Sequence, residues 1–316
     1  MKNCFGWGMS LSLIMLLSLT PPVLAKELHF AVCLPTLDIP HFIAQKYGYE
    51  DEAKKLGIKL TVYDAGGYVN LNRQIQQIED ATAAKVDAMI LVSINPTGTI
   101  PVVEDAVKAG IPVINVNVMC DSPKIIARIR SDDHEIGRVA GEFLAKKLQN
   151  KGNLLLISGA AGSSVALMRV EGVKSVIKKY PAMKILSEQW LQATRADAMR
   201  VMEDMLQKYG DDIQGVFCNG EPLAMGVSLT LEAAKRRDVF IIGVDFTRDL
   251  ERAIRDGKIA GTINQQTITM GRMGVRIAKD VVEGKKVPPI TYTPITLLTA
   301  DNLDTIDRSG FLIPAK

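Results

Sequence analysis

Histidine, cysteine and aromatic residues are scarce in this 316-residue chain, and each shortage narrows its possible functions. Three histidines (His29, His41 and His134) leave little material for histidine-based catalysis. The four cysteines follow no Cys-x-x-Cys or Cys/His spacing, so no metal site is predicted. Aromatic residues make up 5% of the chain, so an aromatic side chain in a polar loop is a candidate for stacking on a ligand.

An excess of one charge and the common enzyme motifs are also missing. The chain has 38 Lys and Arg against 35 Asp and Glu, a net charge of +3, which argues against a nucleic-acid partner. The loop Gly159–Ser164 lacks the lysine of a P-loop and the third glycine of a dinucleotide fingerprint. There is no Gly-x-Ser-x-Gly elbow, and no pair of carboxylates in clearly different environments. We therefore predict no catalytic residue, no cofactor and no enzyme activity.

Long apolar runs are absent except near the beginning of the chain. A positive charge at Lys2 precedes an apolar run from about Met9 to Leu19, prolines at 21–22, and small residues ending at Ala25. This order is typical of a secretory signal peptide that is cleaved near Ala25. The run is shorter than the roughly 20 residues that span a bilayer, although an uncleaved membrane anchor is the alternative. The predicted location is the periplasm.

Three cysteines follow the predicted signal peptide. Because an odd number cannot be fully paired in an oxidising compartment, at least one of Cys33, Cys120 and Cys218 must lack an intramolecular disulfide partner. Cys33 and Cys218 lie in apolar runs, so we expect buried free thiols that pack as small hydrophobic side chains.

Short apolar runs alternate with longer amphipathic ones along the rest of the chain. The apolar runs are rich in Val and Ile, as in strands buried on both faces of a parallel sheet. They are Leu28–Leu34, Lys59–Asp64, Ala88–Ile94, Pro112–Val118, Leu154–Ser158, Lys184–Ser187, Gly215–Cys218, Phe240–Val244 and Ala260–Ile263. Helical patterns lie between them. This alternation predicts a doubly wound parallel α/β fold, and it occurs in two series, from Leu28 to about Asp132 and again from Gly152.

Polar side chains gather where the predicted strands end. Parallel sheets bind ligands at these carboxyl ends. The residues there combine amides, carboxylates and a few aromatics, a set that suits a compact polar solute. The alternative to ligand binding is a structural role for each residue. Asp38 can stand at the start of a helix, Asp245 can cap the helix near Thr247, and Glu221 suits a first helical turn.

Several of these segments resemble the type I periplasmic binding proteins of the ribose-binding and LacI-like superfamily. The matching landmarks are Pro35–Phe42, Ala109–Ile114, Ser131–Asp133 with Gly137 and Ala140-Gly141, Gly243–Asp245 and Ala260–Gln265. The resemblance implies two Rossmann-like lobes joined by a three-crossing hinge, with a ligand cleft between them. It implies a first lobe of residues 26–131 plus 266–298 and a second lobe of residues 132–265 plus 299–316.

The resemblance also implies a ligand pocket. Carried over position by position, the pocket falls on Asp38, His41, Phe42, Asn117, Arg169, Asn219 or Glu221, Asp245 and Gln265. Asn95 lies at another predicted strand end and joins the candidates. The sugar binders have an Asp-Arg pair where this chain has Asn117-Val118, usually an arginine at Leu167, and an aromatic at Val244. These departures argue against ribose or an ordinary aldopyranose as the ligand.

A shorter segment, Asp64–Leu71, resembles a turn of TorT-like proteins, the periplasmic partners of a sensor kinase that responds to trimethylamine N-oxide. This resemblance implies that Tyr68 lines the cleft. With Phe42 and Trp190 it could form an aromatic cage for a small cation or zwitterion. The alternative is a tight turn with a surface tyrosine.

Two functions follow from these resemblances. The first is a monomeric solute-binding protein that captures a small polar, sugar-like ligand and delivers it to the permease of an ABC importer. The alternative is a TorT-like sensor that docks on a membrane histidine kinase. A transcription regulator of the same superfamily is disfavoured, because no helix-turn-helix precedes the first predicted strand.

Overall fold

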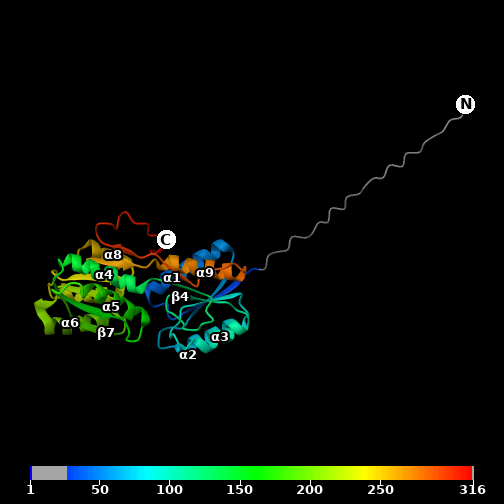
Figure 1. Cartoon of the computed structure of the whole chain (residues 1–316), viewed down its shortest axis with the longest axis horizontal. Coiled ribbons are helices and arrows are strands. Elements are labelled where there is room, and N and C mark those ends of the chain that lie inside the picture. Colours follow the sequence, from blue (N-terminus) through cyan, green and yellow to red (C-terminus); the bar gives the residue numbers. More distant parts are fainter. Residues whose placement is uncertain (2–26, 315–316) are drawn as a thin grey trace.

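The computed structural model describes residue 1 and residues 27–314, so the predicted signal peptide lies outside the described residues apart from Met1. The described chain forms two α/β lobes, each built on one six-stranded sheet (Figure 1). No helix among the described residues has the length and apolarity needed to cross a membrane.

The two sheets have closely similar topologies. The order is β11-β5-β4-β3-β1-β2 in the first lobe and β12-β10-β9-β8-β6-β7 in the second. Among the described strands, every pair is parallel except β10 with β12. The first sheet contains β1 (His29–Leu34), β2 (Lys59–Asp64), β3 (Ala88–Leu91), β4 (Val113–Val116), β5 (Ala127–Arg130) and β11 (Ile290–Tyr292). The second contains β6 (Gly152–Ser158), β7 (Met183–Trp190), β8 (Gly215–Cys218), β9 (Phe240–Val244), β10 (Gly261–Asn264) and β12 (Thr296–Leu298).

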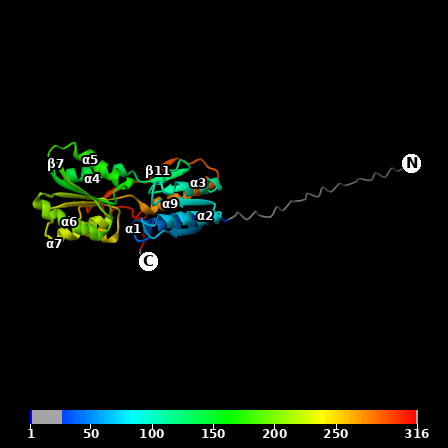
Figure 2. The same cartoon turned by 90° about the horizontal axis from the view of Figure 1, so that it is seen from below.

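Helices cover both faces of each sheet (Figure 2). In the first lobe, α1 (Pro40–Leu56) and α9 (Thr267–Val282) pack on one face, with α2 (Leu71–Ala83) and α3 (Ile100–Lys108) on the other. In the second lobe, α4 (Asp133–Lys147) and α5 (Ser164–Ile177) cover one face. The opposite face is covered by α6 (Arg195–Tyr209), α7 (Glu221–Ala233) and α8 (Arg248–Arg255), and a 3₁₀ turn lies at Gly210–Asp212. This arrangement confirms the predicted doubly wound fold with two lobes.

The chain crosses between the lobes three times. The first crossing lies between β5 and α4, the second between β10 and α9, and the third between β11 and β12. The third crossing differs from the expected boundary at residue 298. Thr296–Leu298 pairs antiparallel with β10 of the second sheet, so the chain already leaves the first lobe after Tyr292. The strand β12 therefore belongs to the second lobe.

Two glycine contacts bring helices together beside the junction of the lobes. A Cβ on Gly48 of α1 would lie 2.2 Å from the carbonyl oxygen of Ile268 in α9. A Cβ on Gly137 of α4 would lie 1.9 Å from the carbonyl oxygen of Arg169 in α5. Only glycine permits such close backbone packing. These two contacts set how closely α1 packs on α9 and α4 packs on α5.

Candidate ligand-binding site

Four predicted site residues form one hydrogen-bonded cluster between the lobes. His41 stands in the first turn of α1, Asn117 follows β4, Asp245 follows β9, and Gln265 lies on the second crossing. His41 Nδ1 lies 3.1 Å from Asp245 Oδ1, and His41 Nε2 lies 2.7 Å from the Asn117 amide nitrogen. Gln265 donates to the same Asp245 oxygen over 2.6 Å. Both ring nitrogens of His41 therefore lie within hydrogen-bonding distance of a side chain from another element.

Left-handed backbone conformations aim two of these side chains toward the junction. Asn117 has φ 62° and Asp245 has φ 76°, a region that Asn and Asp enter more readily than most residues. The backbone N–H of each still donates to the neighbouring strand, Asn117 to Ile129 and Asp245 to Ile263. β4 and β9 therefore stay paired up to their last residues, and Asn117 and Asp245, which come next, turn their polar side chains out of the sheets.

Arg169 lies beneath the cluster and is committed to protein partners. Its side chain is buried, and it donates to Asp133 over 2.9 Å, to Gln265 Oε1 over 3.1 Å and to Asn219 Oδ1 over 3.3 Å. The Asp133 carboxylate also accepts from Arg130 over 2.7 Å. Arg169 therefore holds Asn219 and Gln265 in place more than it offers a free positive charge.

The carboxyl groups of Asp245, which is partly buried, and Glu221, which is buried, have opposite pKa shifts. Burial alone would raise the pKa of Asp245, but attraction to His41, the hydrogen bond from His41, and contributions from Arg169 and Gln265 lower it to about 2. Burial raises the pKa of Glu221, partly offset by Arg195 at 3.3 Å and reinforced by Asp245. Asp245 is therefore a permanent anion at neutral pH.

A narrow recess of about 20 Å³ opens beside the cluster. Its wall combines the polar groups of His41, Glu221 and Asp245 with apolar atoms of Ile39 and Phe246. A volume of this size is about that of one water molecule. The side chains of the two lobes are therefore in close contact here and satisfy one another's hydrogen-bonding groups.

The three predicted aromatic residues do not all meet. Phe42 is buried, and its ring centroid lies 5.0 Å from that of His41 and 6.3 Å from that of Tyr68. Tyr68 remains 44% exposed. Trp190 is partly buried at the end of β7 and packs against the core shared by α4 and α5. Phe42 and Tyr68 thus form an aromatic pair in the first lobe, with Trp190 standing on the second.

Asp38 and Asn95 lie outside the hydrogen-bonded cluster, on exposed turns. Asp38 is exposed, and its backbone N–H donates to Thr36. Asn95 is exposed as well, and its side-chain oxygen accepts from the backbone N–H groups of Thr97 and Gly98. Asn95 therefore has a local role in the turn before α3, and its place in a ligand site stays a prediction.

Three residues of the network were absent from the predicted site. Asp133 pairs with Arg169, Ser131 donates to Gln265 Oε1 over 2.9 Å, and Arg195 pairs with Glu221. Ser131 lies on the first crossing and Asp133 begins the helix that follows it, and this position is the signal that marks them in the sequence. Arg195 lies at the start of α6 and carries no pattern that distinguishes it from a surface arginine.

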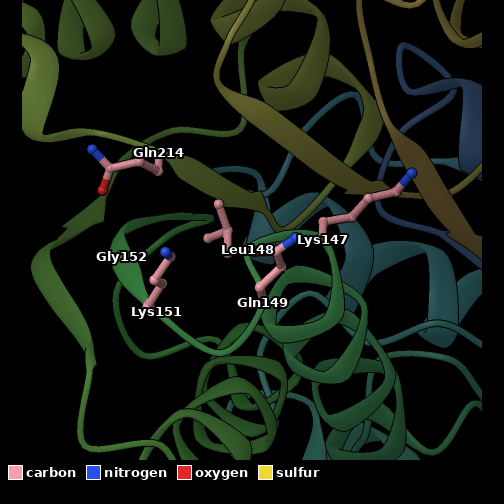
Figure 3. Close-up of a pocket in the computed structure, with 6 residues that line it drawn as sticks. All are labelled: Lys147, Leu148, Gln149, Lys151, Gly152 and Gln214. Carbon is pink, nitrogen blue, oxygen red and sulfur yellow. The ribbon is translucent and has the colours of Figure 1, made fainter.

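A second concave surface lies far from this cluster. Figure 3 shows its lining residues, Lys147, Leu148, Gln149, Lys151, Gly152 and Gln214. It lies at the amino ends of β6 and β8, opposite the edge where parallel sheets bind ligands. The amine of Lys147 stands over the rings of Phe143 and Phe240 at 5.6 and 5.9 Å. This surface contains none of the predicted site residues.

The cysteines and the acidic residues form no further site in the described part of the chain. Cys33, Cys120 and Cys218 are free and buried, and burial raises the pKa of the Cys33 thiol to about 12. No group of three or more His, Cys, Asp and Glu side chains within residues 27–314 is arranged to hold a metal ion.

The family profile described as "Periplasmic binding protein domain" matches residues 30–286, which span both sheets and the whole cluster. The chain belongs to this periplasmic binding protein family. It is 32% identical over 260 residues to the ribose import binding protein RbsB of Salmonella typhimurium, covering 81% of this chain and 86% of RbsB. RbsB of Bacillus subtilis is 30% identical over 312 residues, covering 95% and 99%.

Solved structures of binding proteins share the two-lobed fold. An ABC transporter solute-binding protein from Bacillus halodurans with bound myo-inositol has a TM-score of 0.82 and 28% identity, covering 88% of this chain and 96% of that one. An Actinobacillus succinogenes protein with bound D-allose has a TM-score of 0.85 and 24% identity, covering 89% and 100%. The family model and the RbsB relatives describe binding proteins, and this periplasmic binding protein is not an enzyme.

Proposed function

We propose that this protein binds a sugar-like, polyhydroxylated solute between its lobes and delivers it to the permease of an ABC importer. One observation supports this most strongly. The side chains of His41 and Asn117 from the first lobe meet Asp245 from the second, next to Gln265 on a crossing. A ligand placed among them would contact both lobes at once.

The chemistry of these groups suits hydroxyls. The amides of Asn117 and Gln265 each donate and accept, while ionised Asp245 accepts the stronger, charge-assisted hydrogen bonds. Hydrogen bonds to the ligand's hydroxyl groups would replace the ones that His41, Asn117 and Asp245 now make to one another. A solute that lacks one of these groups would leave a buried polar atom unpaired, which makes the site selective.

The proposed ligand class excludes ribose itself. Asn117-Val118 replaces the Asp-Arg pair of the sugar binders, and Arg169, two residues after Leu167, is already paired with Asp133. A site with fewer charged groups suits a neutral polyol or a less common sugar. Related proteins carry such names: a xylitol-binding protein of Mycolicibacterium smegmatis is 28% identical over 268 residues, covering 84% of this chain and 76% of that protein.

The proposed mechanism is closure of the lobes about three crossings. Ser131 on the first crossing donates to Gln265 on the second, and Thr293 on the third donates to the Gln265 carbonyl over 3.2 Å. A ligand that bonds to both lobes makes more contacts in the closed form, so it shifts the population toward closure. The permease then recognises the closed form. We expect the protein to act as a monomer in the periplasm.

The sensor alternative depends on the short segment Asp64–Leu71. The relatives that match most of the chain are import binding proteins. Import is therefore the function we propose. Deletion of the gene should abolish uptake of the ligand, whereas a sensor would leave uptake intact and change a kinase-dependent response.

A thermal-shift screen of the mature protein tests the ligand class. The panel contains ribose, allose, xylitol, myo-inositol and, for the sensor alternative, trimethylamine N-oxide. We expect a polyol or rare sugar to stabilise the fold by about 2.7 kcal/mol at a hundredfold excess over its dissociation constant. Stabilisation by trimethylamine N-oxide alone would overturn the proposal. Trp190, the only tryptophan after residue 25, supplies an independent fluorescence signal from the second lobe.

A further inference from the structure

The C-terminal segment follows an unusual path after the last strand. We call residues 301–314 the strap. In Figure 1 it runs as a red segment along the second lobe past α8 toward the junction of the lobes. Figure 2 shows the same red segment reaching the side of α1. The strap is therefore a candidate for contacts with both lobes.

On the second lobe the strap is held by ion pairs and buried apolar side chains. Arg308 pairs with Glu251 of α8 at 2.9 Å, and Asp304 pairs with Arg255 at 2.6 Å. Leu303 and Phe311 are buried in the core beneath α6, α7 and α8. These anchors fix the strap to the lobe that carries Asp245.

On the first lobe the strap bonds to the start of α9. The carbonyl oxygen of Gly310 accepts from the backbone N–H of Thr269 over 3.0 Å, and that of Ser309 accepts from Arg272 over 2.9 Å. Arg272 also donates to Asp51 of α1 over 2.7 Å. A Cβ on Gly310 would lie 2.7 Å from Thr269 Oγ1, so the approach is close. The strap thus adds a noncovalent connection to the three covalent crossings.

The strap also supports the loop that carries the ligand-site carboxylate. The Phe311 ring packs edge-to-face on Phe246, with centroids 5.1 Å apart. Phe246 directly follows Asp245, whose φ is 76°. An aromatic pair of this kind contributes beyond its buried area, so Phe311 restrains a loop whose backbone is already constrained.

We propose that the strap sets the relative position of Asp245 and His41 across the junction. Phe311 is its positioning residue on the second lobe, and Gly310 is its contact with the first. With these contacts intact, the resting angle between the lobes keeps Asp245 within reach of the first turn of α1. The inference rests on the proposed function only in taking Asp245 as a ligand-site residue.

The test measures the distance between the lobes without any ligand. Nitroxide labels are placed on Glu79→Cys of α2 and Glu203→Cys of α6, both exposed, while the three described native cysteines are buried. Phe311→Leu keeps an apolar side chain but loses the ring contact. Gly310→Val forces a side chain against Thr269 Oγ1. We expect both variants to shift the distance distribution to longer values and to broaden it.

Phe143→Ala is the matched control, because Phe143 is a similarly buried phenylalanine on the other face of the same sheet. It should lower the melting temperature and leave the distance distribution unchanged. If Phe311→Leu and Gly310→Val also leave the distribution unchanged, the strap is only structural and the inference is wrong. Failure of every solute in the thermal-shift panel would overturn the proposed function without affecting this distance result.

Discussion

The buried charges around Asp133 allow a quantitative prediction. Asp133 lies between Arg169, whose guanidinium is 2.9 Å away, and Arg130, at 2.7 Å, and the side chains of Asp133 and Arg169 are almost fully buried. Asp133→Ala leaves two arginines facing each other without a counter-charge. Removing one partner of a buried pair costs about 3–5 kcal/mol. We expect a loss of free energy of unfolding in that range.

The opposite change is predicted to cost less. Arg169→Met removes one cation, yet Asp133 keeps Arg130, and Gln265 Oε1 still accepts from Ser131. We expect the free energy of unfolding to fall by about 1–3 kcal/mol, mainly because acceptors of Arg169 are left without a donor. The double variant should lose less than the sum of the two, since the charges are coupled.

Urea unfolding followed by circular dichroism measures both variants, with the midpoint and slope fitted separately. A two-lobed protein need not unfold in one step, so Trp190 fluorescence follows the second lobe by itself. The reasoning is refuted if Arg169→Met proves as costly as Asp133→Ala, or if the two losses simply add.

Three further predictions concern pH, packing and capping. The pKa of Asp245 is lowered to about 2 in the folded state, so the ionised carboxylate adds about 2 kcal/mol to the free energy of unfolding. This stabilisation is complete above about pH 4 and is lost as the pH falls through 2. Asp245→Asn should flatten that part of a pH-dependent unfolding curve, and an unchanged slope would contradict the shift. Gly137→Ala should lower the free energy of unfolding by about 1–3 kcal/mol, because the new Cβ would meet the carbonyl of Arg169. Gly159→Ala is the control: the atom nearest to its new Cβ lies 4.0 Å away, so thermal unfolding should be nearly unchanged. Thr194→Ala should cost about 1 kcal/mol by loss of the cap on α6, and restoration by Thr194→Ser would separate capping from packing.

The alternation of apolar and amphipathic runs was enough to predict the fold, because strands such as β3 and β4 are buried on both faces and read as continuous apolar segments. The short strands β5, β11 and β12 were not predicted. Ala127–Arg130 alternates buried and partly buried residues, and β12 has three residues whose partner, β10, is remote in sequence. Tertiary pairing, and not local pattern, defines these strands.

The site was predictable to the extent that it lies at strand ends. Asp245 and Gln265 meet because they follow the neighbouring parallel strands β9 and β10, whose carboxyl ends lie at one edge of the second sheet. Asn117 follows a strand of the first sheet and is joined to Asp245 through His41. Asn95 also follows a strand, yet its side chain is used by its own turn. The pairing of Arg169 with Asp133 could not be read from the sequence, because it depends on how closely α4 and α5 approach at Gly137.

The central claim is that one solute bridges both lobes, and calorimetric titration of the best solute from the panel tests it most directly. Asn117→Ala alters only the first lobe and Asp245→Ala only the second, while Asn95→Ala serves as a strand-end control outside the cluster. The account predicts one site per chain and a loss of affinity of about tenfold or more for each of the first two variants, with wild-type affinity for the control. Wild-type affinity in either Asn117→Ala or Asp245→Ala would contradict a ligand held between the lobes by this cluster.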